Sequence, residues 1–530
     1  MSDRILLDCT LRDGGYLNDW NFGEEAIATV FDRLVSAHTD WIEVGFLDER
    51  RSFDPGRTIQ PDTASFDRIF EKLDKGGSRI TAMIDFGTCP LDRLSPKKES
   101  RIDGIRIIFK KDKMRPALAF SKEVKALGYA VFVQAVSITS YSDEDLKELI
   151  DLVNEVRPYA VSMVDTYGLL DSTGLDHIIE VIDRELDPGI ALGYHAHNNF
   201  QLGYANVMSV LNTKTERTIL VDGTLYGMGK SAGNAPIELI AMYMNRRFGR
   251  AFDVLQMQEA IQTCIMDLFL KKPWGYTLFY YIAAANHCHP DYVAYLMNKR
   301  TLSVSAINEI LERIPEEEKL NKNMALIENL YLDYQATECN DDGEIEALKA
   351  VFFEERKVLV IGPGRNALLE KEKVVRKIRE EQPLVVSINY LPEEYHPDIL
   401  FLTNSRRYNQ IAYKLQHSYV IPVATSNVKS AGRGFEFTLN YRSLIDENAE
   451  FPDNSLLMFL RLLMKLGVRE VLLAGFDGYT PDDINYYDGK MAYDFVREKT
   501  DILNRQVKEF LRGEGKDLRV TFVTKSHYEE

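Results

Sequence analysis

The stretch Ile190-Ala-Leu-Gly-Tyr-His-Ala-His-Asn-Asn199 joins an apolar run to a pair of histidines. The run Ile190–Tyr194 predicts a buried β-strand, and the two-residue period of a strand places His195 and His197 on the same face. Two imidazoles side by side at a strand end are typical of a metal site, although hydrogen-bonded core or surface histidines would give the same local pattern. The organisation of the surrounding chain helps to distinguish a metal site from structural histidines.

Short apolar runs alternate with amphipathic helical segments over the first part of the chain. Eight of these runs are candidate strands, at residues 5–9, 41–46, 80–86, 105–109, 130–136, 160–164, 190–195 and 218–221. Eight βα units are the number in a TIM (β/α)8 barrel, so we predict an α/β protein with such a barrel over residues 1–250. Barrel chemistry lies at the carboxyl ends of the strands, which makes the polar residues after each run candidate site residues.

The rest of the chain predicts two further parts. Residues 251–355 show helical periodicity and predict a helical extension. From residue 356 to 530 the βα alternation resumes, which predicts a doubly wound, Rossmann-like α/β domain. Its first strand runs into Gly362-Pro-Gly-Arg-Asn366, where glycines can bring backbone N–H groups to a phosphate. Any tight strand-to-helix turn favours glycine, and the motif is not the Gly-x-Gly-x-x-Gly of a dinucleotide site.

Composition narrows the class of protein. The 530 residues are 45% hydrophobic and 27% charged, and no apolar run approaches the roughly 20 residues that span a bilayer. The five cysteines lack Cys-x-x-Cys spacing, and the amino terminus has no signal-peptide pattern. We therefore expect a cytoplasmic protein with free thiols and no membrane partner. A formal charge of −17 disfavours a nucleic-acid partner.

Polar residues at two strand ends predict a metal site in the barrel. Asp13, after the first strand, can converge with His195 and His197 on the barrel axis, giving one oxygen and two nitrogens for a divalent cation such as Mg²⁺ or Mn²⁺. This ligand set leaves open positions for a bidentate substrate such as a 2-oxo acid, whose carbonyl the ion would polarise. Arg12 would then stabilise the developing enolate, or would form only a structural ion pair with Asp13.

Three motifs in this order resemble the metal-dependent aldolase and lyase superfamily (DRE-TIM), which includes 4-hydroxy-2-oxovalerate aldolase, hydroxymethylglutaryl-CoA lyase and the isopropylmalate synthases. They are Asp8-Cys-Thr-Leu-Arg-Asp-Gly14, Gly193-Tyr-His-Ala-His-Asn-Asn199 and Val221-Asp-Gly-Thr-Leu-Tyr-Gly-Met-Gly-Lys-Ser-Ala-Gly-Asn-Ala-Pro236. The resemblance covers roughly residues 4–300, since Trp274-Gly-Tyr276 and the aromatic segment after it are similar to the oxovalerate aldolases.

The resemblance implies roles for several residues. Asp13, His195 and His197 match the metal ligands, Arg12 matches the residue that stabilises the enolate, and Asn234 matches a further or water-mediated ligand. Four more residues are candidates for substrate binding because they lie at strand ends of the barrel: Glu43, Asp85, Asp165 and Thr166.

The sequence departs from the hydroxyoxovalerate aldolases at one position. Those enzymes have an acid/base histidine just after the Arg-Asp-Gly turn, whereas this chain has Gly15-Tyr16. A tyrosine with a pKa of about 10 is a poor base at neutral pH unless a metal or Arg12 lowers that pKa. We therefore expect a different substrate, with Tyr16 as acid/base, with assistance from Tyr276, or with the role moved elsewhere.

These observations predict a divalent-metal-dependent aldolase, a carbon–carbon lyase that acts on a 2-oxo acid and an aldehyde through a pyruvate-like enolate. A Claisen-type acyl-CoA synthase or lyase of the same superfamily and a catalytically silent binding barrel are the alternatives. The resemblance also suggests a homo-oligomer, because family members commonly associate through the helical segment.

The carboxy-terminal domain resembles the nucleotide-binding fold of bacterial sialyltransferases. Five residues match positions that hold a cytidine nucleotide there: Gly362, Asn389, Asn404, Ser405 and Asp477. The first turn departs from the usual Gly-Asn-Gly-Pro-Ser, so this resemblance is compatible with a bifunctional aldolase–glycosyltransferase or with a domain that only binds a nucleotide or nucleotide-sugar. Such a domain would suit sugar-acid or surface-glycan metabolism, while regulation or assembly of the barrel are competing roles.

Overall fold

The computed structural model of the chain describes residues 3–353, 357–430, 434–481, 485–486 and 499–529. The chain divides into two compact units, Met1–Pro290 and Asp291–Glu530. The helical residues after 250 are shared between these units: α9 to α11 belong to the first, and α12 to α16 to the second. The three-part division at residues 250 and 355 stays a prediction.

The first unit contains a closed parallel barrel. Its strands are β1 (Arg4–Asp8), β2 (Trp41–Leu47), β4 (Arg79–Asp85), β5 (Gly104–Phe109), β6 (Ala130–Val136), β7 (Ala160–Asp165), β8 (Ala191–Ala196) and β9 (Ile219–Gly223). Neighbouring strands pair in parallel, and β1 pairs with both β9 and β2, which closes the sheet. The predicted barrel is confirmed. The two-residue strand β3 (Ile59–Gln60), beside the end of β2, was not predicted.

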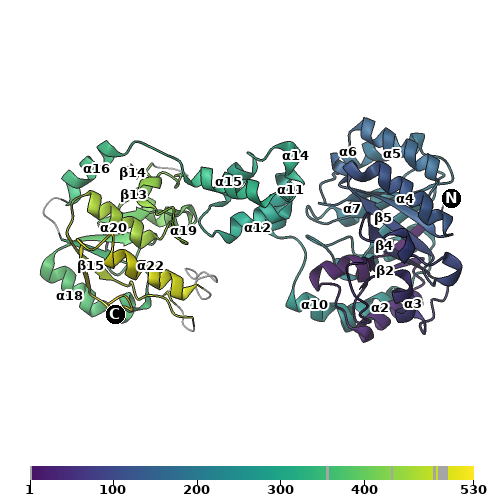
Figure 1. Cartoon of the computed structure of the whole chain (residues 1–530), viewed down its shortest axis with the longest axis horizontal. Coiled ribbons are helices and arrows are strands. Elements are labelled where there is room, and N and C mark those ends of the chain that lie inside the picture. The colour runs from purple at the N-terminus through teal and green to yellow at the C-terminus, as the bar shows by residue number, and fades with distance from the viewer. Residues whose placement is uncertain (1–2, 354–356, 431–433, 482–484, 487–498, 530) are drawn as a thin grey trace. The chain divides into compact units, whose positions relative to one another are not determined.

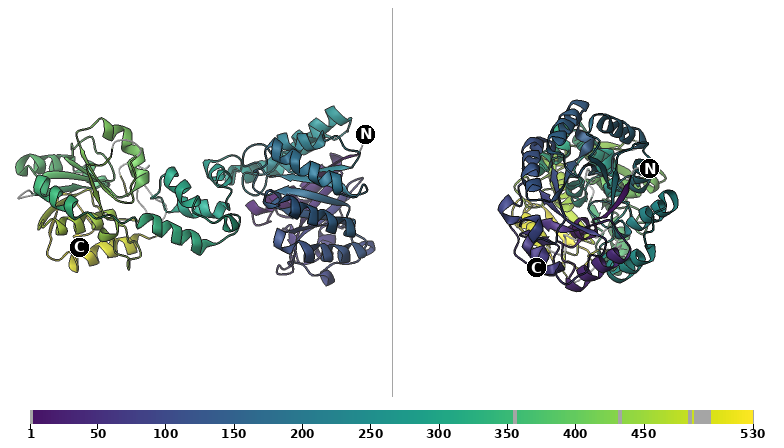
Figure 2. Two further views of the ribbon diagram at one scale, coloured as in Figure 1. Left: turned by 90° about the horizontal axis from the view of Figure 1, so that it is seen from above. Right: turned by 90° about the vertical axis from the view of Figure 1, so that its right-hand side faces the viewer.

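Helices cover the outside of the barrel, as the end-on view in Figure 2 and the labelled strands in Figure 1 show. They are α2 (Glu24–Ser36), α3 (Thr63–Phe70), α4 (Met114–Ala126), α5 (Asp143–Val156), α6 (Ser172–Glu185), α7 (Gly203–Leu211), α8 (Ile237–Phe248) and α9 (Val254–Ala260). The short helix α1 (Thr10–Asp13) instead follows β1 directly, and α10 (Met266–Lys271) and α11 (Leu278–Ala285) come after α9 in the chain. Helix α5 illustrates their origin, because its apolar stripe faces the core and Ser142 with Asp145 forms a capping box at its start.

The inside of the barrel is divided into an apolar and a polar layer. Trp41 on β2 and Phe132 on β6 come from non-adjacent strands, and their ring centroids lie 4.9 Å apart. They belong to a buried apolar cluster that also contains Leu7 and Leu220. Toward the carboxyl ends of the strands the inward side chains become charged, so the apolar layer closes the lower part of the barrel and the polar layer underlies the site.

The second unit begins with helices and continues with an open parallel sheet. The helices before the sheet are α12 (Pro290–Asn298), α13 (Val304–Leu311), α14 (Glu316–Lys319), α15 (Met324–Gln335) and α16 (Asp342–Leu348). The strands are β10 (Val358–Ile361), β11 (Leu384–Ile388), β12 (Ile399–Leu402), β13 (Ile421–Thr425), β14 (Phe437–Leu439), β15 (Glu470–Ala474) and β16 (Arg519–Phe522). Their order is β14-β13-β12-β11-β10-β15-β16. The predicted second α/β sheet is confirmed, while the three-residue strand β14 was missed.

Helices pack on both faces of this open sheet. They are α17 (Arg365–Leu369), α18 (Lys371–Glu381), α19 (Ser405–Gln416), α20 (Ser455–Lys465) and α22 (Thr500–Arg512). Val358 and Val360 pack in one core with residues of α20 and α22, whereas Leu359 and Ile361 pack in another with residues of α17 and α18. Because β10 is flanked by β11 and β15, the strand order reverses there, which is where ligands bind in such sheets.

Two further expectations concern the whole chain. In the parts of the chain that the structure describes, no helix combines the length and apolar character that a membrane span requires. All five cysteines are free thiols: Cys9, Cys89, Cys264, Cys288 and Cys339.

Candidate metal centre

Asp13, His195 and His197 meet at the carboxyl end of the barrel. Asp13 closes the short helix α1, which follows β1 directly, and its N–H donates to the Cys9 carbonyl at 2.8 Å. His195 lies on β8, and His197 lies one residue beyond the strand. One donor atom from each of the three side chains lies within 4.8 Å of the other two. All three are buried, so the predicted convergence of one carboxylate and two imidazoles is a feature of the folded chain.

The loop after β9 holds two of these side chains by its backbone. The Lys230 N–H donates to Asp13 Oδ1 at 3.1 Å, and the Lys230 carbonyl lies 3.1 Å from His197 Nδ1. A His197 ring that donates from Nδ1 to this carbonyl presents the lone pair of Nε2, which lies 3.9 Å from Asp13 Oδ2. The loop backbone therefore orients His197 as a ligand.

Asn234 reaches the same place from this loop. A Cβ on Gly229 would lie 2.1 Å from Asn234 Nδ2 and 3.3 Å from Asp13 Oδ1, so only glycine allows this approach. Asn234 Nδ2 donates to the Met228 carbonyl at 3.2 Å, whereas the buried Asn234 Oδ1 has no hydrogen-bond partner among the described residues. A buried amide oxygen without a partner, on a residue that approaches the same glycine as Asp13, fits a further or water-mediated ligand to a cation.

The environment shifts the pKa values of the three ligand residues in different directions. Burial would raise the pKa of Asp13, but Arg12 and the two histidines lower it well below its ordinary value. Burial lowers the pKa of His197 to about 3, so its ring is neutral at physiological pH. Burial also favours neutral His195, yet hydrogen bonds to Asp13 and Asp222 outweigh it and raise that pKa. Metal binding at His195 would require that Nε2, which lies 3.1 Å from Asp13 Oδ2, carries no proton.

Charged side chains beneath the ligands leave an excess of negative charge. The network of ion pairs contains three carboxyl groups, from Asp13, Glu43 and Asp222, and two guanidinium groups, from Arg12 and Arg106. The formal balance is therefore one negative charge, which suits a bound cation. Together with the orphaned Asn234 oxygen, this balance makes the residues present fit a divalent metal.

Arg106 and Asp222 were not among the predicted site residues. Arg106 is the one charged residue in the apolar strand Gly104-Ile-Arg-Ile-Ile-Phe109, and a charge inside a buried strand is the signal that could have identified it. Asp222 ends β9, where the strand-end rule makes it a candidate, and its Oδ2 lies 3.0 Å from His195 Nδ1.

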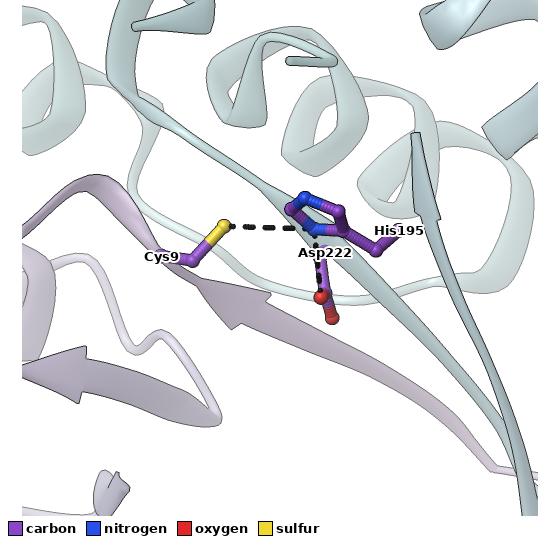
Figure 3. A group of neighbouring side chains, drawn as sticks. All are labelled: Cys9, His195 and Asp222. Atoms are coloured by element: carbon purple, nitrogen blue, oxygen red, sulfur yellow. Dashed lines mark hydrogen bonds and ion pairs between the residues drawn. The ribbon is translucent and has the colours of Figure 1, made fainter. Parts of the chain in front are cut away.

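A second group of possible ligands, Cys9, His195 and Asp222, shares His195 with the first (Figure 3). Cys9 Sγ lies 4.0 Å from His195 Nδ1 and donates to the Gly223 carbonyl at 3.4 Å. Burial raises the pKa of the Cys9 thiol well above its ordinary value, so the sulfur stays protonated. Asp222 is already paired with Arg106. This group therefore surrounds the inner side of the His195 ring and does not form a second ion site.

Tyr16 lies at the mouth of the site in an aromatic cluster. Its ring centroid is 4.9 Å from that of Trp20 and 6.1 Å from that of Phe46, and the Lys230 ammonium lies 5.4 Å from the ring centroid. Burial raises the pKa of the Tyr16 hydroxyl above its ordinary value. The hydroxyl therefore keeps its proton at neutral pH, which suits a proton donor better than a base.

The other predicted barrel residues differ in how they are placed. Glu43 is fully buried, and its Oε2 accepts from Arg12 and Arg106. Asp165 accepts from the N–H groups of Leu169 and Leu170, which closes the loop after β7.

The remaining three lie in different settings. Thr166 Oγ1 accepts from the Ser137 N–H at 2.8 Å. Asp85 is exposed at the end of β4, and Tyr276 is half exposed, with its ring centroid 6.5 Å from that of Tyr281. The substrate roles of these residues stay predictions.

The second unit has a cavity of about 980 Å³ at the carboxyl edge of its sheet. Asn389, Asn404 and Asp477 line it, whereas Gly362 and Ser405 do not. Gly362 allows close approach of strand ends, because a Cβ there would lie 2.6 Å from the Gly475 carbonyl oxygen, and Ser405 Oγ donates to the Asn427 carbonyl. The structure thus brings three of the five predicted residues to one cavity.

Asn389 adopts a left-handed conformation with φ 56° at the end of β11. Its amide donates to Thr403 Oγ1 and Ser455 Oγ at 2.9 and 2.8 Å, and its Oδ1 accepts from the Thr403 N–H at 2.9 Å. This network ties three strand and helix ends together and fixes a polar wall of the cavity.

Part of this chain is similar to a known protein family and to several known proteins. Residues 106–264 match the model of the HMGL-like family. Oxaloacetate decarboxylase of Mycobacterium tuberculosis is 24% identical over 281 residues, which cover 51% of this chain and 78% of that protein. A 4-hydroxy-2-oxovalerate aldolase of Pelotomaculum thermopropionicum is 25% identical over 274 residues, which cover 51% of this chain and 77% of that protein. The HMG-CoA lyase structure from Bacillus subtilis aligns with 51% of this chain and 94% of its own, at 15% identity and a TM-score of 0.41.

The family-model match lies in the barrel unit and includes β8 and β9, with His195, the adjacent His197 and Asp222. The predicted resemblance to the metal-dependent aldolases and lyases is confirmed by the family model and by the names of the relatives. Residues 106–264 of the barrel unit are therefore similar to the HMGL-like family.

Proposed function

We propose that the barrel unit is a divalent-metal-dependent carbon–carbon lyase that cleaves or forms an aldol bond to a pyruvate-like enolate. The observation that carries this proposal is the convergence of Asp13, His195 and His197 within 4.8 Å beside the guanidinium of Arg12. The names of both curated relatives contain 2-oxo acids, oxaloacetate and 4-hydroxy-2-oxovalerate, which supports a 2-oxo acid substrate here.

Asp13, His195 and His197 would hold the ion, with Asn234 as a further or water-mediated ligand. A bound Mg²⁺ or Mn²⁺ ion would supply Lewis-acid polarisation of the substrate carbonyl. Arg12 is fixed next to the ligands, since its Nη1 lies 3.0 Å from Asp13 Oδ2 and its Nε donates to Glu43 Oε2 at 2.8 Å. A guanidinium that is held in place before the reaction stabilises the negative charge that develops on the enolate oxygen.

Tyr16 is the proposed proton donor at the mouth of the site. Its raised pKa keeps the hydroxyl protonated, so in the condensation direction it would protonate the oxygen of the aldehyde. The Lys230 ammonium beside its ring adds a positive charge that favours an anionic substrate. Tyr276 would assist only from the edge of the site, given its exposed position.

Deuterium exchange tests this function directly. With Mn²⁺ or Mg²⁺ and pyruvate in deuterated water, the full-length chain should exchange the methyl protons of pyruvate, because enolisation precedes the carbon–carbon step. A chain that binds the metal and exchanges no 2-oxo acid would contradict the pyruvate enolate. Exchange of acetyl-CoA protons instead would favour the Claisen-type alternative, and no metal binding would favour a silent barrel.

For the second unit we propose that its cavity binds a nucleotide or a nucleotide-linked sugar. The supporting observation is the cavity of about 980 Å³ at the point where the strand order reverses, with Asn389, Asn404 and Asp477 in its wall. In this proposal the barrel substrate or product is a sugar acid for a surface glycan, and the unit either carries it or transfers it. A cytoplasmic location and a homo-oligomer complete the proposal.

Calorimetry on the full-length chain with CMP, CDP, UDP and GDP tests the second proposal. The full chain is required because residues from 298 to 336 also line the cavity. Binding of one of these nucleotides supports a carrier, transferase or sensor, whereas no binding by any of them would leave only a role in assembly.

A further inference from the structure

Arg106 is a fully buried arginine inside the barrel. It lies in the middle of β5, and its guanidinium points into the polar layer beneath the metal ligands. Burying a guanidinium is costly unless every charge is paired, and the layer below shows that this barrel can also be filled with apolar side chains. The presence of an arginine at this position therefore has to be explained by the groups that it contacts.

Three side chains accept hydrogen bonds from Arg106. Nη1 lies 3.2 Å from Glu43 Oε2 on β2, and Nη2 donates to Gln134 Oε1 on β6 at 2.8 Å. Nη2 also donates to Asp222 Oδ2 on β9. The planar guanidinium thus ties three strands together across the inside of the barrel, in a fork geometry that an ammonium group does not reproduce.

The carboxyl groups that Arg106 holds lead to the site by two routes. On one side Asp222 Oδ2 lies 3.0 Å from His195 Nδ1, and His195 Nε2 lies 3.1 Å from Asp13 Oδ2. On the other side, Glu43 Oε2 accepts from Arg12 Nε at 2.8 Å.

The two routes meet again at Asp13. Arg12 Nη1 lies 3.0 Å from Asp13 Oδ2, the same oxygen that faces His195. The six side chains therefore form a closed ring of ion pairs and hydrogen bonds, in which Arg106 is the member opposite Asp13.

We propose that Arg106 is a positioning residue for the metal centre: it fixes Asp222 so that His195 keeps its proton on Nδ1 and presents Nε2, and it fixes Glu43 so that Arg12 faces Asp13. This role rests on the proposed function of the barrel. A carboxylate bonded to the far nitrogen of a histidine sets its tautomer and its ring orientation. Arg106 in turn holds the two carboxylates that contact His195 and Arg12, so it supports a metal ligand and the enolate-stabilising residue at the same time.

Arg106→Met removes the charge and keeps much of the volume, while Arg106→Lys keeps one charge without the fork. Arg217→Met is the matched control. Arg217, just before β9, is also a buried arginine of this barrel. It bonds to Asp183 and to the Leu186 and Ile190 carbonyls, away from the ligands. A purely structural role predicts that both Met variants behave alike.

The first measurement is the Mn²⁺ affinity of the full-length chain by calorimetry. We expect Arg106→Met to weaken Mn²⁺ binding roughly 10- to 100-fold, the usual loss when the support of a ligand is removed, and Arg106→Lys to fall between. Arg217→Met should lower the melting temperature and leave the affinity unchanged. Equal affinity in wild type and Arg106→Lys, or equal losses in the two Met variants, would overturn the proposal.

The second measurement uses the metal-free chain, so that it does not depend on the proposed function. In ¹⁵N-histidine spectra, assigned with His195→Gln, the Nδ1–H proton of His195 should be protected from exchange by its bond to Asp222. The signal should be lost or shifted in Arg106→Lys and Arg106→Met and retained in Arg217→Met. A wild type without Mn²⁺ affinity but with this change would refute the metal proposal and keep the positioning role, whereas an unchanged signal would refute the positioning role itself.

Asp222→Asn separates the two routes if Arg106→Met does not fold. This substitution should disturb the His195 signal and Mn²⁺ affinity while leaving the Glu43–Arg12 side intact. When it is combined with Arg106→Lys, the loss of affinity should be smaller than the product of the separate losses, because both changes act through the same bond. Independent, multiplicative losses would show that Arg106 does not act through Asp222.

Discussion

The two parallel sheets of this chain differ in what lies at the carboxyl ends of their strands. In the barrel, eight strands surround one axis, and inward side chains at their ends form a buried ionic ring. In the second unit the sheet is open, its strand ends spread apart, and they border a cavity of about 980 Å³. The carboxyl ends of the strands therefore form a candidate ion site where the sheet closes and border a cavity where it does not.

The carboxyl groups of the two places show the same difference. Burial would raise the pKa of Asp13 and of Asp222, but Arg12, Arg106 and His195 lower both below the ordinary value. At the cavity, burial raises the pKa of Asp477 to about 6, and the hydrogen bond from the Asn366 N–H compensates only in part. The carboxylates of Asp13 and Asp222 are therefore paired with cations, whereas Asp477 Oδ1 at the cavity has no hydrogen-bond partner among the described residues.

The largest expected effect comes from removing a metal ligand of the barrel. Asp13→Asn should abolish metal binding and enolisation, because it removes the anionic ligand that both histidines face. His195→Ala should do the same. Metal content measured by elemental analysis and pyruvate exchange are the two readouts. Cys9→Ala is the control, and a chain that loses metal with Cys9→Ala but retains it with Asp13→Asn would show that the ion occupies the other cluster.

Next in size is the effect of Tyr16→Phe. Removing a proton donor costs about 10²- to 10⁴-fold in turnover, and we expect that loss in the turnover number for aldol condensation. Metal content should not change, since the Tyr16 ring packs against Trp20 and Phe46, which are not metal ligands. Turnover at the wild-type level would assign the proton transfer to another group.

On the cavity side, Asn404→Ala should weaken nucleotide binding about tenfold, the cost of one lost hydrogen bond to a ligand. Asn404 also caps α19 by accepting from the Arg407 N–H, so Asn404→Ser, which keeps a capping oxygen, distinguishes loss of the ligand contact from loss of the cap. Ser405→Ala is the neighbouring control, because this hydroxyl faces Asn427 and not the cavity. Calorimetric affinities equal to wild type in both Asn404 variants would move the site elsewhere.

The smallest effect concerns Asp477 and pH. Its folded-state pKa of about 6 lies above the ordinary 3.8, so the folded chain binds this proton more tightly than the unfolded chain. The wild-type carboxyl consequently destabilises the fold as pH rises through this window, and the penalty is complete above it. Asp477→Asn cannot ionise and should gain stability relative to wild type between about pH 4 and pH 7, by less than about 1 kcal/mol after solvent screening. Melting temperatures at both pH values provide the measurement, and a relative loss on raising the pH would contradict the assigned environment.

Local pattern was sufficient for most of the fold. Each of the eight predicted barrel strands overlaps an observed one, because a parallel strand buried on both faces appears in the sequence as an apolar run between polar segments. The strands that were missed, β3 and β14, have two and three residues. Such short strands carry no period and form because a longer neighbour offers them hydrogen bonds.

The sequence by itself determined the residue types and the spacing of the site: Asp13 after the first strand, and His195 and His197 two residues apart at the end of the seventh barrel strand. It could not determine the partners of these residues, because ion pairs across a barrel join positions that are far apart in the chain. Arg106 and Asp222 are 116 residues apart, and His195 and Asp13 are 182 residues apart. Only closure of the barrel places them in one ring, and only the open second sheet leaves the cavity, since both depend on how the strands are arranged and not on any single strand.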